Sequence, residues 1–203
     1  MGDEIKKAIE TYNKFAKIYA DYTAHKLLQF QLNKFISLLP KKANVLDAGC
    51  GAGRDVSYLL EEGLDVIGID IAEKLLEEAK QRVKEGKFLK MDLLNLEFPD
   101  KNFDGIWCMA TLADFEKKDA SKVLTNFNKI LKDKGIIYIA VKEGEGEQII
   151  KKEKYNNEPR FYAFYKEDEL NKLLKENGFK VIESMVSYDG NNAWVEIFAK
   201  KIS

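Results

Sequence analysis

The stretch from Asn44 to Arg54, which reads N-V-L-D-A-G-C-G-A-G-R, constrains the fold of this chain more than any other. It opens as a short apolar run, typical of a strand buried on both faces. An acid, Asp47, and three alternate glycines follow, and apolar residues then recur at helical spacing (Val56, Leu59 and Leu60). The pattern predicts a strand, a glycine turn and a helix, because glycines allow positive φ and a close approach of a ligand. The free N–H groups at the helix start favour electron-rich groups.

The residues of this turn allow two interpretations. It can be a tight strand-to-helix turn without a ligand. It can also be a nicotinamide-dinucleotide site, whose pattern G-x-G-x-x-G/A has a third small residue that packs helix on strand. Arg54 stands at that third position, and a large charged side chain weakens the dinucleotide interpretation.

Strands and helices alternate beyond the turn. Apolar runs predict strands at 66–69, 88–91, 103–109 and 136–141, and helical spacing predicts helices at 54–62, 73–83, 119–131 and 167–176. The alternation indicates a parallel sheet. Residues 178–187 and 193–200 are predicted to form two strands joined by a turn, which is an antiparallel hairpin. A dinucleotide-binding fold ends with parallel strands instead.

Two acids end predicted strands. Asp70 follows the glycines at the distance that puts an acid beside a bound ribose in a Rossmann-type unit, where it could accept hydrogen bonds from both hydroxyls. It could instead cap the next helix. Asp92 closes the next strand, before Leu93 and Leu94, and could also be a plain loop or cap residue.

Residues 3–39 are predicted to be helical throughout, with a second helix from about Thr23 to Leu39. The arm carries Tyr12, Phe15, Tyr19 and Tyr22, which either pack it on the body or form a lid whose tyrosine hydroxyls reach a ligand. Residues 142–165 have the length and polarity of a functional insertion. The aromatic residues at its end form either a short packed strand or a wall for a substrate (Phe161, Tyr162, Phe164 and Tyr165).

Composition bounds the class of protein. The 203 residues suit one domain, 1–203, with a helical arm over 1–40, and 33 Lys+Arg against 34 Asp+Glu give no bias toward nucleic acid or anionic membrane. There is no bilayer-length apolar run and no signal peptide, so we expect a cytoplasmic protein without a membrane partner. Cys50 and Cys108 are expected as reduced packing thiols, and a single histidine, His25, excludes a histidine-rich metal site; we expect no metal.

The glycine loop with Asp47, the acids Asp70 and Asp92, and the terminal hairpin, taken in order, resemble the class I S-adenosylmethionine-dependent methyltransferases. More narrowly, they resemble the small proteins of the generic methyltransferase-domain type. The resemblance covers about residues 44–200. It implies an α/β, Rossmann-like three-layer sandwich with a seven-stranded, mostly parallel sheet, order 3-2-1-4-5-7-6, an antiparallel last strand and the helical arm. It also implies S-adenosylmethionine as the cofactor.

The resemblance assigns the cofactor-binding residues. The methionine end is expected over Gly49 to Gly53, with the backbone near Met109 and Ala110 receiving its amino group, the ribose at Asp70 and the adenine at Asp92. The full set expected to contact the cofactor is Asp47, Gly49, Cys50, Gly51, Gly53, Arg54, Asp70, Ile71, Asp92, Leu93, Met109 and Tyr19.

No catalytic residue is carried over from the resemblance. The loop after the fourth strand often holds a histidine in this subgroup, and Asp114 stands there instead. The sulfonium methyl is already activated, so in-line displacement needs mainly alignment and exclusion of water. If the acceptor must lose a proton, Asp114, Glu143 and Tyr162 are candidates, and Arg160 could hold an acidic substrate.

A small molecule is the expected acceptor. The stretch after the fourth strand, Ala110 to Ala113, lacks the N/D-P-P-Y-like pattern of amino-methylating nucleic-acid enzymes, and Cys108 lacks the setting of a cytosine-C5 nucleophile. A methyltransferase acting on RNA or protein, a nicotinamide-dependent oxidoreductase and a non-catalytic cofactor-binding sensor or partner subunit remain as alternatives. The sequence leaves the acceptor atom and the choice between monomer and homodimer open.

Overall fold

The computed structural model describes residues 3–151, 153, 156–190 and 192–202. Seven strands form one sheet in the spatial order β3 (Lys87–Lys90), β2 (Asp65–Asp70), β1 (Asn44–Ala48), β4 (Phe103–Met109), β5 (Leu131–Lys142), β9 (Asn192–Lys201) and β8 (Phe179–Asp189). β9 is antiparallel to both of its neighbours, and the pairs from β3 to β5 are parallel. This order confirms the predicted sheet with its antiparallel last strand.

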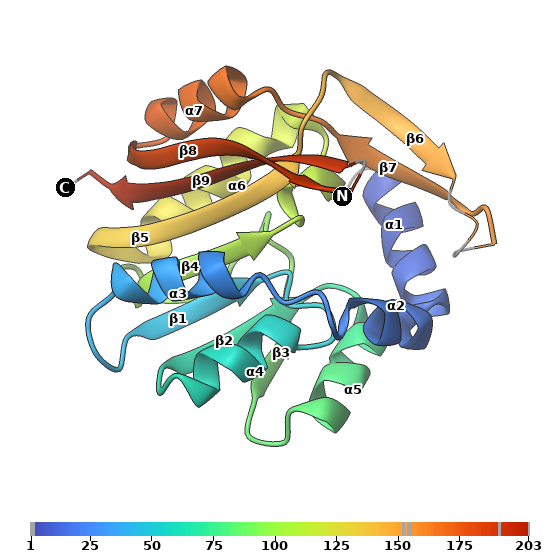
Figure 1. Cartoon of the computed structure of the whole chain (residues 1–203), viewed down its shortest axis with the longest axis horizontal. Coiled ribbons are helices and arrows are strands. Elements are labelled where there is room, and N and C mark those ends of the chain that lie inside the picture. Colours follow the sequence, from blue (N-terminus) through green and yellow to red (C-terminus); the bar gives the residue numbers. More distant parts are fainter. Residues whose placement is uncertain (1–2, 152, 154–155, 191, 203) are drawn as a thin grey trace.

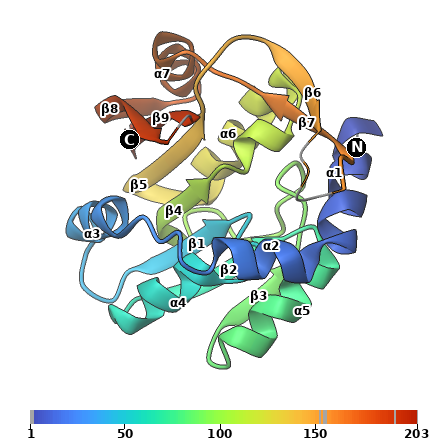
Figure 2. The ribbon, with the colours of Figure 1, turned by 45° about the vertical axis from the view of Figure 1, so that its right-hand side comes forward.

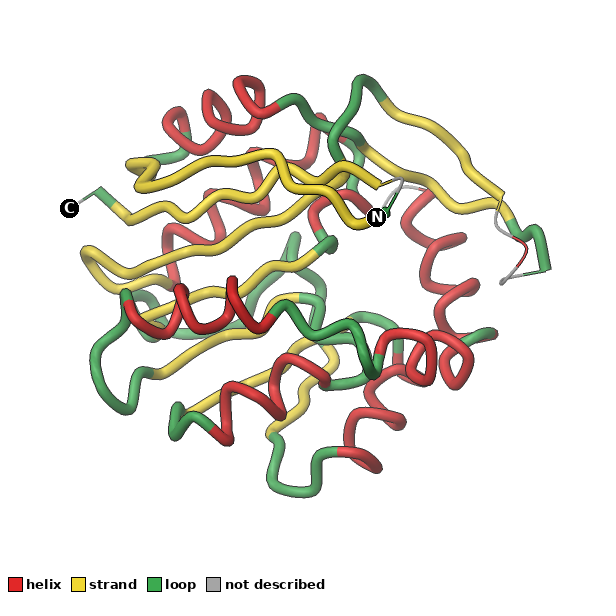
Figure 3. Tube along the Cα trace, in the orientation of Figure 1, coloured by secondary structure: helices red, strands yellow, loops and turns green. Residues whose placement is uncertain are grey.

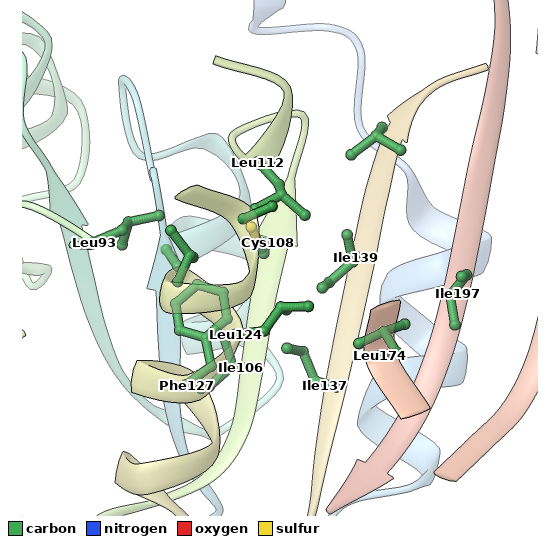
Figure 4. Close-up of a cluster of buried hydrophobic side chains, with 14 of the residues drawn as sticks. Leu93, Ile106, Cys108, Leu112, Leu124, Phe127, Ile137, Ile139, Leu174 and Ile197 are labelled. Atoms are coloured by element: carbon green, nitrogen blue, oxygen red, sulfur yellow. The ribbon is translucent and has the colours of Figure 1, made fainter. Parts of the chain in front are cut away.

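Helices cover both faces of the sheet, which gives three layers (Figure 1). On one face lie α3 (Gln29–Ser37), α4 (Arg54–Glu61) and α5 (Glu73–Arg82), and their core includes Phe35, Val56 and Leu76. On the other lie α6 (Lys117–Ile130) and α7 (Glu167–Glu176). Figure 4 shows this second core, in which Leu124 and Phe127 face Ile106 and Ile137. Full burial of such side chains contributes roughly 1.5–3 kcal/mol each.

The N-terminal arm lies beyond the carboxyl ends of the parallel strands, as Figures 1 and 2 show. α1 (Asp3–Lys14) packs against α5 and β7 (Pro159–Ala163), and α2 (Ala16–Thr23) packs against α5. Ligands of open α/β sheets bind at this edge, so the arm can cover a bound ligand.

The prediction of continuous helix over residues 3–39 is wrong at Phe15, which separates α1 from α2, after Ser37, where α3 ends, and over one longer stretch. Residues 24–28 are not helical, and the helix expected from about Thr23 begins at Gln29 instead. The Thr23 hydroxyl donates to the Tyr19 carbonyl oxygen at 2.8 Å, a local bond that competes with helix continuation. The described part of the chain has no helix that is long and apolar enough to cross a membrane.

The insertion at 142–165 contains an antiparallel hairpin of β6 (Glu147–Lys151) and β7, separate from the main sheet (Figure 3). From its length and polarity we predicted a functional insertion here. Phe161 and Tyr162 are buried on β7, which is the short packed strand considered as one alternative. β7 packs on α1 and on the short 3-10 helix η1 (Leu112–Asp114).

Candidate cofactor and acceptor site

Two adjoining cavities open at the carboxyl edge of the sheet. Cavity 1 lies over β2 and the segment after β3, and its lining includes Ile69, Asp70, Ile71, Met91, Asp92 and Leu93. Cavity 2 lies over β1, β5 and β9, and its lining includes Asp47, Cys50, Arg54, Asp55, Ala140, Lys142, Arg160, Tyr162, Tyr188, Trp194 and Glu196. Both cavities share Tyr12, Tyr19, Gly49, Met109 and Ala110. A molecule longer than either cavity could therefore reach both across the glycine loop.

The first glycine is fixed by its neighbours. The backbone N–H groups of Gly49 and Cys50 both donate to the Ile69 carbonyl oxygen, at 2.8 and 2.9 Å, which ties the loop to the end of β2. Gly49 has φ 84°, and a Cβ there would lie 2.0 Å from the Thr111 hydroxyl oxygen. Only glycine fits this position, because both the backbone conformation and the space exclude a side chain.

The other two glycines differ in role. A Cβ on Gly51 would lie 3.3 Å from the Tyr19 ring, so the arm tyrosine covers this glycine across the cavity. A Cβ on Gly53 would meet the Phe88 ring at 3.0 Å, and Gly53 lines neither cavity. Gly53, with φ 82°, is the N-cap residue of α4 and serves the turn, while Gly49 and Gly51 line the cavities.

Asp70 is held by the backbone at the mouth of cavity 1. Its Oδ2 accepts from the Gly51 N–H at 2.9 Å and its Oδ1 accepts from the Ala72 N–H at 2.8 Å. Burial raises the pKa of Asp70 to about 6, although these two N–H groups act in the opposite direction. A carboxylate offers about four acceptor positions, so Asp70 can still accept from a ligand beside the N–H groups of Gly51, Ala72 and Ile71. The Asp70 side chain does not cap α5, whose N-cap residue is Ala72.

Asp47 presents a buried acid to cavity 2. Its side chain is only 2% exposed, and its Oδ2 has no hydrogen-bond partner among the described residues. Burial, and next the negative charge of Asp55, raise the pKa of Asp47 well above the usual range. Since an unpaired buried carboxylate is costly, a cationic or donor group bound in cavity 2 would offset that cost.

Arg54 is already engaged by its neighbour. Its Nε and Nη2 donate to the two oxygens of Asp55 at 2.6 and 2.8 Å, and the Trp107 indole N–H donates to Asp55 Oδ2 at 2.9 Å. The pair fastens the start of α4 to β4 beside the glycine loop. Arg54 lines cavity 2 from this fixed position.

We expect Asp55→Asn to lower the free energy of unfolding by about 2 kcal/mol, because Asn keeps one acceptor oxygen but loses a charge-assisted bond to Arg54. Chemical denaturation measures this change. Asp104→Asn is the control, since Asp104 accepts from the more exposed Lys132 at 2.9 Å. An Asp55 variant no less stable than this control would contradict the expectation.

The remaining residues expected to contact the cofactor lie around cavity 1. Ile71, Asp92, Leu93 and Met109 all line it. Asp92 Oδ1 accepts from the Leu94 N–H at 2.9 Å, which turns the chain after β3 toward the cavity. Cys50 lines cavity 2 with a thiol whose pKa is raised by burial.

The structure brings together three of the four catalytic candidates. Arg160, 5% exposed, donates to Asp114 Oδ1 at 3.1 Å, and its guanidinium lies 4.2 Å from the Tyr12 ring centroid and 4.9 Å from that of Tyr162. Tyr12 also donates to Asp114, at 3.0 Å, and accepts from Arg160. Asp114, on η1, is therefore committed to an ion pair with β7, and the Tyr12 hydroxyl on α1 bonds to both partners. Burial raises the pKa of Tyr12, which remains a donor.

The fourth candidate, Glu143, lies outside both cavities and accepts from Lys166 at 2.8 Å. Cys108 is fully buried within β4, and burial raises the pKa of its thiol to about 12, so it is no nucleophile.

Sequence reasoning missed Glu196. It lines cavity 2 at 3% exposure and accepts hydrogen bonds from Tyr138, Gln31 and Ser187. The available signal was a lone acid in the apolar strand sequence A-W-V-E-I-F-A.

Comparison with known proteins decides the family. Residues 45–135 match the methyltransferase domain family. The chain belongs to the class I S-adenosylmethionine-dependent methyltransferases. Over 152 residues, 68% of this chain and 63% of that protein, it is 32% identical to the demethylmenaquinone methyltransferase of Thermotoga maritima. The region that matches this chain makes up 55% of the length of one curated relative and 63% of the length of another.

Solved structures agree on this methyltransferase fold. The 1,6-didemethyltoxoflavin-N1-methyltransferase of Burkholderia thailandensis, solved with bound 1,6-didemethyltoxoflavin and S-adenosylhomocysteine, superimposes with a TM-score of 0.78 at 23% identity, covering 98% of this chain and 88% of that one. An S-adenosylmethionine-dependent methyltransferase of Methanosarcina mazei gives a TM-score of 0.77 at 20% identity, covering 83% and 97%.

Proposed function

We propose that this chain binds S-adenosylmethionine across the two cavities and transfers its methyl group to a small-molecule acceptor. The observation that carries the proposal is the glycine loop at the junction of the cavities, with one acid on each side: Asp70 in cavity 1 and Asp47 in cavity 2. A molecule with a ribose at one end and an ammonium at the other suits these two acids.

The chain's own residues would hold the two ends of the cofactor differently. In cavity 1, Asp70 would accept from the ribose hydroxyls, Asp92 from the exocyclic amine, and the apolar side chains of Ile71 and Leu93 would pack on the adenine. In cavity 2, the unpartnered oxygen of Asp47 would accept from the ammonium group. Gly49 and Gly51 would let the backbone approach the ligand closely.

The cofactor, when bound, supplies an activated methyl group on a sulfonium. The protein then needs to align the acceptor and exclude water. The arm supports that role, because Tyr12 and Tyr19 line both cavities and their rings lie edge to face with centroids 5.3 Å apart. The ion pair of Asp114 with Arg160 would hold η1 and β7 together beside the site, and Tyr12, bonded to both, would hold α1 over it.

A small acceptor suits cavity 2, whose lining combines aromatic side chains with residues of the sheet. The net charge of -1 gives no general attraction to nucleic acid.

Methyl-labelled S-adenosylmethionine tests the proposal. We would incubate the protein with it and with extract of the source cells, then separate small molecules, protein and nucleic acid. We expect label among the small molecules. Label in RNA or protein would assign another acceptor class, and cofactor binding without label in any fraction would favour a non-catalytic role.

We expect the affinity for S-adenosylhomocysteine to be constant above about pH 7 and to fall about tenfold per pH unit below about 6. The pKa of Asp70 in the free protein is about 6, and its ionised form accepts from the ribose. Folding raises this pKa from 3.8 to about 6, so the folded protein binds this proton more tightly than the unfolded chain does. The stability of the free protein therefore falls as the pH rises from 3.8 to about 6. Calorimetric titrations from pH 5 to pH 8 measure the affinity, and a flat profile would remove the role of Asp70.

A further inference from the structure

Three buried carboxylates line cavity 2: Asp55 is paired with Arg54, and the other two, Asp47 and Glu196, lie on strands of the sheet. Asp47 on β1 and Glu196 on β9 both line the cavity on the side of the sheet that carries α3 and α4, where Val45, Tyr138 and Phe198 form the core beneath them. Ala140 on β5 pairs with Glu196 in the strand register and lines the same cavity. Its small side chain leaves space beside Glu196. If the cofactor's ammonium lies at Asp47, Glu196 belongs to the acceptor end.

The carboxylate of Glu196 has room for one further donor. Its Oε1 accepts from Gln31 at 3.3 Å and from the Ser187 hydroxyl, and its Oε2 accepts from the Tyr138 hydroxyl at 2.9 Å. A carboxylate offers about four acceptor positions, two on each oxygen. Three are used by residues from α3, β8 and β5, so the remaining position lies on Oε2.

The surroundings of Glu196 select the kind of molecule that can fill that position. Tyr162, Tyr188 and Trp194 line the same end of the cavity and offer flat apolar surfaces. The Lys142 ammonium lies 5.7 Å from the ring centroids of both Tyr162 and Trp194. Because a cation of the protein already lies over these rings, a second cation in the acceptor would be repelled.

We propose that Glu196 is the residue that selects the acceptor, and that the acceptor is an uncharged planar aromatic molecule donating one N–H or O–H to Glu196 Oε2. This inference rests on the proposed function, since it takes the Asp47 end of cavity 2 as the cofactor end.

Three probes of similar size test the inference on protein loaded with S-adenosylhomocysteine: indole, which has one N–H donor, 1-methylindole, which has none, and 1-indanone, which has an acceptor carbonyl and no donor. Saturation-transfer NMR titrations give their affinities. We expect indole to bind about tenfold or more tightly than 1-methylindole, the effect of one hydrogen bond to a buried charge.

Glu196→Gln should reverse this preference. Gln31 and Ser187 both donate to the Oε1 position and would keep the amide oxygen there, which leaves the amide NH₂ where Oε2 was. That position would then donate, so we expect indole to lose its advantage and 1-indanone to bind more tightly than indole.

Glu183→Gln is the matched control, because Glu183 also joins the terminal hairpin to α3, through Lys34, but lies outside cavity 2. The control should keep the wild-type order of the probes, and both variants should keep wild-type affinity for S-adenosylhomocysteine. Equal binding of the two indoles, no binding of indole, or an unchanged order in Glu196→Gln would overturn the inference. Failure of the wild type to bind S-adenosylhomocysteine would instead refute the proposed function, and the probes can then be titrated on the unloaded protein.

Discussion

Asp70→Ala is expected to weaken binding of S-adenosylhomocysteine by at least about a hundredfold. The change removes the carboxylate that would accept from the ribose hydroxyls, and each hydrogen bond to a charged group contributes roughly 1.5–3 kcal/mol. It also frees the N–H groups of Gly51 and Ala72, which Asp70 now holds in place at 2.9 and 2.8 Å. Isothermal titration calorimetry with S-adenosylhomocysteine measures the loss.

The matched control is Asp65→Ala at the other end of the same strand. Asp65 is an exposed acid whose carboxylate pairs with Lys87 at 3.0 Å, far from both cavities. Exposed pairs of this kind contribute little, so this variant should bind the ligand as the wild type does. An Asp70→Ala protein with near-wild-type affinity would show that the ribose is held elsewhere and would remove Asp70 from the site.

The sheet and its helices were predictable because their signals are local. The apolar runs of β1, β2 and β4 are bounded by glycines and acids, so each strand can be located without knowledge of its neighbours. The order of the strands came from the family resemblance. The acids Asp47, Asp70 and Asp92 all reached the cavities because each lies in or just after a strand at the carboxyl edge of the sheet.

The parts that were not predictable depend on contacts between distant segments. The interruption of the arm at residues 24–28 involves a side-chain to backbone bond at Thr23 that periodicity does not register. The environment of Glu196 is made by Gln31, Tyr138 and Ser187, which come from three elements and share no sequence pattern. Arg160 and Asp114 could be proposed one by one, but their ion pair requires the hairpin to fold back on η1.

Gly51→Val is expected to abolish binding of S-adenosylhomocysteine, whereas Gly63→Val, its matched control, is expected to leave it unchanged. Both glycines have positive φ, 52° and 81°, so both variants carry the backbone strain of a β-branched residue in that conformation. Only at Gly51 does the new side chain enter the cavity, where a Cβ already lies 3.3 Å from the Tyr19 ring; at Gly63 a Cβ meets nothing within 4 Å.

Comparing the two variants by thermal unfolding and calorimetry separates strain from blockage. A similar loss of stability in both, with loss of ligand binding in Gly51→Val alone, is the expected result, because strain is common to the two positions and the cavity is not. Retained binding in Gly51→Val would mean that the ligand does not lie against the glycine loop. Loss of binding in both variants would mean that strain, and not the added side chain, disables the site.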